Sequence, residues 1–446
     1  MSNNLAGSTS YIQLAPSNHP SNSLISYKDG NPVINFILGE QDRYLIGSSV
    51  RLMGNISVYK TPNGDFGDIP LTTDDLQINP KLGVYGILEQ VTISSQKSKN
   101  VIESVRHYGN FLSAYLPNTT SKEEALGHLA VTSGMCPNPD CQRLTFVNNL
   151  NGSSATNRDF RGNSFCINIP TGFLMSKENI NLSGRGGGVG GLEFSFNLAP
   201  DVMFLNGSWT QAFYQLSDVN LVCEVINPSV DELSRMMKET SATMEYNAIT
   251  SYYQTIQSSN AIINFRLGLS RVLGAFMTFI PSEFLNNLTY DSYQTSPLIN
   301  NFTTGEVAPV KQVIFLRGGE RVPLQYNLDT NVRDDANSII ADPQLTRNYM
   351  NSFMSFMKNL KTQQSPITNK RELEPADNFN YADAGLLFGI GVAFDNISGQ
   401  GLDFRTENFG VQMDTGLTNN VPHSAFLFVR SKQTLVMNAN GLQIIQ

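Results

Sequence analysis

The sequence predicts an all-β protein with a few helices, arranged as two similar halves. Three observations predict this: polar residues that are mostly uncharged, runs in which apolar and polar residues alternate, and a short motif that occurs twice. Of the 446 residues, 40% are hydrophobic and only 15% are charged. Surface helices normally carry many Lys and Glu residues, so this composition favours sheets joined by ordered loops. The length exceeds one ordinary core and predicts two or three domains.

Alternation of apolar and polar residues marks the predicted strands. In Leu192–Leu198 every second residue is apolar, and the same period of two appears in residues 50–58 and 219–225. This period places the apolar side chains on one face, as in a half-buried strand of an antiparallel sheet. Clusters of Pro, Gly, Asn and Asp, such as residues 61–65, separate these runs and predict turns.

Three helices are expected between the strands. The first is predicted over residues 100–116, with Asn100 as its cap and Glu103 in its first turn. The second is predicted over residues 229–240, where Ser229 and Glu232 have the spacing of a capping box. The third is predicted over residues 343–360, with Pro343 at its first position.

A short motif in the first predicted helix recurs in the third. Arg, Tyr and Asn follow at alternate positions in both copies: Arg106, Tyr108 and Asn110, then Arg347, Tyr349 and Asn351. A repeat with strand patterns around each copy predicts two copies of one domain. The expected division is a flexible N-terminal arm over 1–30, a first β domain over 31–226, a linking helix over 227–245 and a second β domain over 246–446.

The predicted arm has two interpretations. Residues 1–30 are rich in Ser and Asn and show no periodicity. They form either a disordered tail or a tether that becomes ordered against neighbouring subunits. After the first predicted helix, residues 117–163 form a long loop rich in Pro and Asn that we expect to project from the sheets.

No catalytic, cofactor-binding or metal-binding residues are predicted. Cys136 and Cys141, with His128 and Cys166, have part of a zinc-site pattern, but no second close Cys pair exists, so a loop with free thiols is favoured. The glycine-rich residues 184–191 lack the Lys of a phosphate loop and precede a strand, which predicts a flexible hairpin or insertion.

Catalytic constellations are also missing from the sequence, so the chain is predicted not to be an enzyme. Neither a Gly-x-Ser-x-Gly elbow nor a His-Glu-x-x-His motif occurs. The carboxylate pairs at residues 74–75 and 334–335 are adjacent in sequence, so their side chains point in different directions. Glycoside hydrolysis stays open, because its two carboxylates lie far apart in many sequences. The four histidines are spread along the chain: His19, His107, His128 and His423.

Net charge and hydropathy indicate which binding partners and which location to expect for the protein. The net charge of -8 argues against a surface that coats nucleic acid, and no sequence-specific nucleic-acid binding is expected. No signal peptide is apparent, so we expect synthesis inside a host cell without a secretion signal. The longest apolar runs, residues 272–280 and 386–394, are too short to span a membrane.

Two β-rich repeats, each with a helix before a long loop, resemble the double jelly-roll major capsid proteins of the virophage and polinton-like virus type. The segments that carry the resemblance are residues 44–60, 83–116 and 192–226. It implies two tandem eight-stranded jelly rolls and a homotrimer that forms a pseudo-hexameric capsomer of an icosahedral DNA-virus shell. It also implies neighbouring capsomers, penton proteins and minor capsid proteins as partners, a location in the virion, and no cofactor.

The alternative is a β-sandwich protein that binds or cleaves carbohydrate. Sugar sites favour exposed aromatic platforms, and such proteins are commonly exported. The single Trp and the lack of a signal peptide therefore count against this alternative.

Overall fold

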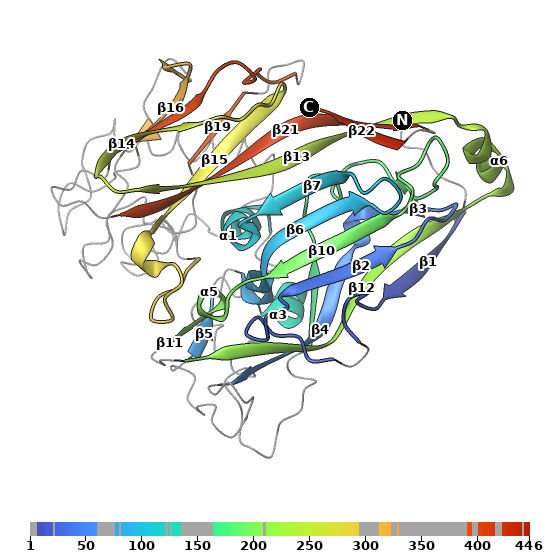
Figure 1. The fold of residues 1–446 in the computed structure, drawn as a ribbon, viewed down its shortest axis with the longest axis horizontal. Helices are drawn as coiled ribbons and strands as arrows, with labels where there is room; N and C mark the ends of the chain where they lie inside the picture. Colours follow the sequence, from blue (N-terminus) through green and yellow to red (C-terminus); the bar gives the residue numbers. More distant parts are fainter. Residues whose placement is uncertain are drawn as a thin grey trace.

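Two β-sandwiches lie side by side in the computed structural model of the chain (Figure 1). The structure describes residues 7–20, 23–59, 76–79, 82–120, 124, 127–134, 164–207, 211–293, 312–322, 328–329, 390–394, 400–414, 422–438 and 441–446. Strands β1 to β12 form the first half and β13 to β22 the second. In the described ranges, no strand of one half pairs with a strand of the other.

The first half has a six-stranded sheet facing a four-stranded sheet. The six-stranded sheet contains β1 (Gly7–Leu14), β3 (Tyr44–Leu45), β4 (Arg51–Tyr59), β8 (Ser164–Asn168), β9 (Ile180–Asn181) and β12 (Phe213–Pro228). The facing sheet has the order β2 (Val33–Leu38), β10 (Leu192–Leu198), β6 (Leu88–Ser95) and β7 (Val101–Arg106). Outside these sheets lie the pair β5 (Leu76–Ile78) and β11 (Leu205–Gly207) and the helices α1 (Tyr108–Thr119), α3 (His128–Ser133) and α5 (Asp201–Phe204).

The alternating runs form strands as predicted. In β10 the four apolar residues are at most 2% exposed, whereas the polar residues between them are partly exposed. Strands β4 and β12 cover the other two predicted runs, and Leu52, Ile56 and Val58 of β4 are buried. A period of two thus fixes which face of each strand meets the core.

The second half consists of two five-stranded sheets. The first contains β13 (Ser241–Ile256), β21 (His423–Asn438), β15 (Val272–Pro281), β19 (Ile390–Ala393) and β22 (Gly441–Ile445); we call it the shared sheet. The second contains β14 (Asn260–Phe265), β20 (Phe409–Asp414), β16 (Gln312–Arg317), β17 (Glu320–Arg321) and β18 (Leu328–Asp329). Helix α6 (Val230–Lys238) joins the halves at the edge of the molecule (Figure 1). Its predicted cap is confirmed, since Ser229 Oγ accepts a hydrogen bond from the Glu232 amide.

The middle of the shared sheet, β15 and the first seven residues of β21, is buried on both faces. All ten residues of β15 are buried. Val272, Ala275 and Met277 pack into the core of the second half, whereas Phe276 and Ile280 pack into a core that continues through the first half. A strand covered on both sides needs apolar residues on both sides, which explains why residues 272–280 form a nearly unbroken apolar run.

The first predicted helix is wrong over its first part. Val101–Arg106 forms strand β7, which pairs with β6, and α1 begins only at Tyr108. Val101, Ile102 and Val105 are β-branched and fit a pleated surface, so pairing with β6 outweighs their helical spacing. His107, with φ of 52°, separates strand from helix. The third predicted helix, and therefore the second copy of the repeat, lies outside the described residues, as does most of the loop over 117–163.

The N-terminal segment is also not a flexible arm where it is described. Gly7–Leu14 forms β1, which pairs with β12 along its whole length. Farther on, the Ser17 amide donates to the Asn35 carbonyl, and Asn18 Nδ2 donates to the Val33 carbonyl. Because Asn35 and Val33 belong to β2, the segment ties the edges of the two facing sheets together.

Helix α1 packs so closely against the second half that one of its positions tolerates only glycine. A Cβ atom on Gly109 would lie 2.5 Å from Cε1 of Tyr293, a buried residue whose hydroxyl donates to the Gly86 carbonyl at 2.7 Å. Gly109→Ala should therefore lower the free energy of unfolding by about 1–3 kcal/mol. In an open helix the same change would raise stability by about 1 kcal/mol.

Chemical denaturation checks this prediction. Gly39→Ala is the matched control, because a Cβ atom there would meet nothing within 4 Å. Equal stability of the two variants would show that α1 and Tyr293 are not in contact in solution.

Candidate functional site: the interface between the halves

The interface between the halves is closely packed and hydrogen-bonded. Strand β7 lies beside β13, and α1 lies beneath the shared sheet (Figure 1). Strand β7 is an edge strand of its own sheet. Side chains of β13 cover this edge: Tyr246 donates from its hydroxyl to the Ile102 carbonyl at 2.8 Å, and the Arg106 amide donates to Ser251 Oγ at 3.0 Å. The second half thus satisfies backbone groups that the first half leaves unpaired.

Glu103 of β7 is a buried carboxylate at the centre of this interface. Its Oε1 accepts hydrogen bonds from the amides of Gly172 at 3.1 Å and Ile249 at 2.8 Å. Its Oε2 accepts from the Phe173 amide at 2.7 Å. Ile249 belongs to β13, whereas Gly172 and Phe173 follow β8 in the first half. One side chain therefore links a strand edge, a loop and the other half of the chain.

The surroundings of Glu103 explain its electrostatics. Burial raises the pKa of this carboxyl above its ordinary value, and the hydrogen bonds from Ile249, Phe173, Thr171 and Gly172 oppose that rise. The backbone groups that face it are all donors, so both oxygens act as acceptors. Such a carboxylate is suited to holding the chain in place, because a group that is fully bonded within the protein has no free oxygen for a substrate.

Aromatic side chains fill the interface around α1. The Phe111 ring lies 6.1 Å from Phe276 and 5.6 Å from Phe428, both in the shared sheet. Nearer the surface, the His107 ring lies 5.3 Å from Tyr253 and 5.1 Å from Phe426. The rings of Phe111, Phe276 and Phe428 are buried in one core, so separating the halves would expose them to water.

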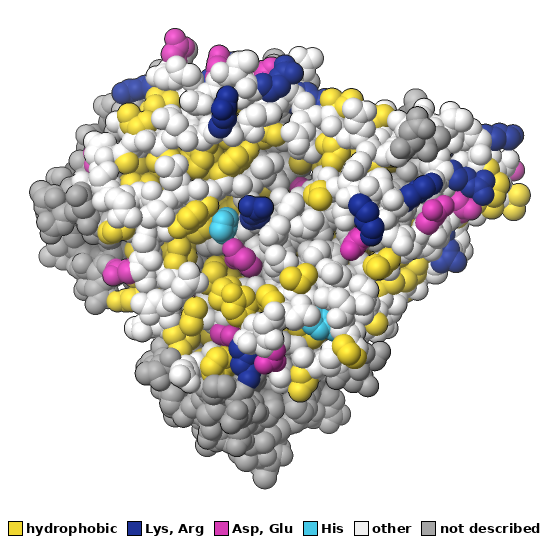
Figure 2. All heavy atoms as spheres, viewed as in Figure 1, with side chains coloured by type: hydrophobic (Ala, Val, Ile, Leu, Met, Phe, Trp, Pro, Cys, Tyr) yellow, Lys and Arg dark blue, Asp and Glu magenta, His cyan; other side chains and the backbone are white. Residues whose placement is uncertain are grey.

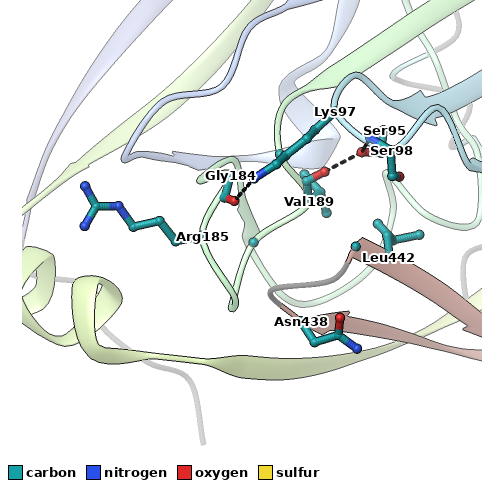
Figure 3. A pocket seen from close by; sticks show the side chains of 11 residues that line it. Ser95, Lys97, Ser98, Gly184, Arg185, Val189, Asn438 and Leu442 are labelled. Atoms are coloured by element: carbon teal, nitrogen blue, oxygen red, sulfur yellow. Dashed lines mark hydrogen bonds between the residues drawn. The ribbon is translucent and has the colours of Figure 1, made fainter.

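The glycine-rich segment, predicted as a flexible hairpin or insertion, turns back on itself in the same interface, where the Gly190 amide donates to the Ser183 carbonyl and the Gly188 amide to the Arg185 carbonyl. A Cβ atom on Gly186 would lie 2.1 Å from the Thr240 carbonyl oxygen, just before β13. Figure 3 shows the Gly184 carbonyl accepting from Lys97 Nζ and the Val189 carbonyl accepting from Ser95 Oγ. The pocket beside this loop holds about 210 Å³ and is lined by both halves. Glycines are needed here because backbone approaches backbone.

Of the residues singled out as possible zinc ligands or carboxylate pairs from the sequence, the structure describes only His128 and Cys166. Cys136, Cys141 and the two Asp pairs lie outside the described residues. His128 lies in α3 and Cys166 in β8. Across the ranges that the structure describes, no three His, Cys, Asp or Glu side chains gather as metal ligands would. Within those same ranges, no helix has the length and apolar character needed to cross a bilayer.

The molecular face in Figure 2 carries its charges in small scattered groups among hydrophobic and uncharged polar side chains. Several charged side chains of the described residues are paired, as in Lys99 with Glu193 at 2.7 Å and Lys432 with Glu245 at 2.7 Å. This face offers no continuous basic surface of the kind that holds a phosphate backbone.

No protein-family model and no curated protein matches the sequence. Solved structures with the same fold are nevertheless found when the structures are compared. The chain is similar to one in the cryo-EM structure of the Sputnik virophage, with a TM-score of 0.56, 11% identity, and coverage of 98% of this chain and 88% of that one. PBCV-1 VP54, fitted into a reconstruction of Sputnik, gives a TM-score of 0.54 at 9% identity over 99% and 97% of the two chains. The Faustovirus major capsid protein gives 0.54 at 9% identity over 97% and 91%.

Replacement of Glu103 tests the interface directly. In Glu103→Gln the shape is kept, but an NH2 group replaces one acceptor oxygen and meets a backbone N–H. We expect the free energy of unfolding to fall by about 2–3 kcal/mol. Glu193→Gln is the matched control, because its partner Lys99 is exposed, and it should cost at most about 1 kcal/mol. Urea denaturation measures both, and equal losses would contradict the role assigned to Glu103.

Proposed function

We propose that this chain, which has the double jelly-roll fold of viral major capsid proteins, is itself a coat subunit of a viral shell. The observation that carries the proposal is the extent of the likeness, because matches with TM-scores above 0.5 cover 97–99% of this chain. Little of the chain is thus left over for a separate domain with another activity.

The interface between the halves supports the same role. A coat subunit has to keep its shape in contact with its neighbours. Strands of the shared sheet that are buried on both faces join the two sandwiches into one body. Low surface charge supports extensive contact between subunits, since desolvating an unpaired charge is costly. Both features favour a structural protein over an enzyme, whose site normally needs an accessible group with unsatisfied chemistry.

The finer assignments belong to this proposal. The subunit forms a homotrimer, the trimer is a pseudo-hexameric capsomer, and capsomers build an icosahedral shell with penton and minor capsid proteins. Each half is one jelly roll, and residues 227–245 join them. The protein resides in the virion shell, and its net charge of -8 supports the absence of direct sequence-specific nucleic-acid binding.

Size-exclusion chromatography with light scattering tests the proposal on the full-length purified chain. We expect a particle of three times the 49.2 kDa chain mass that persists on dilution, and electron microscopy should show it as a pseudo-hexagonal ring. A monomer at every concentration would contradict the proposal. A monomer that also binds on a glycan array would support the carbohydrate-binding alternative.

A further inference from the structure

Strand β1 forms an outer edge of the six-stranded sheet and of the molecule (Figure 1). Its eight residues, Gly-Ser-Thr-Ser-Tyr-Ile-Gln-Leu, contain no charge and no proline. Proteins normally protect an exposed edge with charged side chains, proline, a bulge or a covering segment, because an open edge is a template for another strand. Strand β1 pairs with β12 in unbroken register, and its sequence holds none of these protections.

The register shows which backbone groups of β1 remain available. Tyr11 lies opposite Glu224 of β12. The Glu224 amide donates to Ser49 Oγ, and its carbonyl accepts from the Ile46 amide, so both groups point away from β1. In an antiparallel pair, residues directly opposite each other either exchange both hydrogen bonds or neither. The amide and carbonyl of Tyr11 therefore point to the open edge, as do those of Thr9 and Gln13 by alternation.

The two edge strands of the four-stranded sheet, β2 and β7, differ from β1 because other segments bond to their edges. Side chains of Tyr246 and Ser251 bond to the edge of β7. The edge of β2 is bonded by the segment that contains Ser17 and Asn18. In the described part of the chain, no comparable main-chain bond reaches the outer edge of β1. Tyr11 is 72% exposed, so its side chain does not cover that edge.

We propose that the open edge of β1 pairs with β1 of a second copy of this chain, antiparallel about a two-fold axis. A row of unpaired amides and carbonyls is complementary only to another extended backbone. Pairing centred on Tyr11 places Thr9 opposite Gln13 of the other copy, and no like charges meet because the strand has none. A self-complementary surface of this kind gives a closed two-fold contact.

This inference rests on the proposed function for its biological setting, where it supplies a contact between neighbouring capsomers. It is separable from the trimer in experiment. The trimer has a fixed mass on dilution, whereas pairing through β1 adds larger species whose amount rises with concentration.

The test compares Tyr11→Pro with Tyr11→Ala by sedimentation velocity over a concentration series. Both variants remove the ring, but only proline removes the outward amide, and it leaves the hydrogen bonds to β12 in place. We expect association beyond the basal particle to be at least about tenfold weaker in Tyr11→Pro than in Tyr11→Ala, at equal thermal stability. Equal association of the two variants would overturn the inference, and so would a wild-type chain that never associates beyond its basal particle.

Hydrogen exchange of the wild-type chain decides the matter if the proline variant does not fold. The amides of Ser10 and Ile12 should be protected at all concentrations, because they bond to β12. Those of Thr9, Tyr11 and Gln13 should become protected only at high concentration. Rapid exchange of these three amides in concentrated protein would contradict pairing through β1 whatever the state of the trimer.

Discussion

The two halves are held together by the middle of the shared sheet, where β15 and the first seven residues of β21 are buried on both faces. One face closes the core of the second half, and the other carries Phe276, Phe428 and Leu435 into the core of the first half. Apolar surface on this scale cannot be left in water. The two sandwiches therefore form a single unit, although in the described ranges no strand pairing joins them.

Burying strands in this way also buries backbone N–H and C=O groups, and side chains of the interface bond to them. Where β7 meets β13, backbone groups lose water and need partners within the protein. Glu103 accepts from the amides of Gly172, Phe173 and Ile249, and Tyr246 donates to the Ile102 carbonyl. These bonds work only in one alignment of the halves, so they fix an orientation that apolar packing alone would leave loose.

Elements that depend on a local residue pattern were predicted correctly from the sequence. Elements that depend on contacts between residues far apart in the sequence were missed. Alternation located β10 and β12, and the spacing of Ser229 and Glu232 located α6. Residues 101–106 were predicted as helix because their apolar spacing fits one, and only pairing with β6 reveals the strand. The partners of Glu103 lie 69, 70 and 146 residues away, so no local pattern could assign its role. The apolar run of residues 272–280 was the one available signal for the interface.

The packing at the interface implies that the two halves behave as one rigid unit, as the proposed role of a coat subunit requires. Hydrogen exchange by pulse labelling across a denaturant series tests it most directly, because peptides from β10 report on the first half and peptides from β15 on the second. Both sets of peptides should lose protection at the same denaturant concentration. Two separate midpoints, with one half still protected after the other has unfolded, would contradict it.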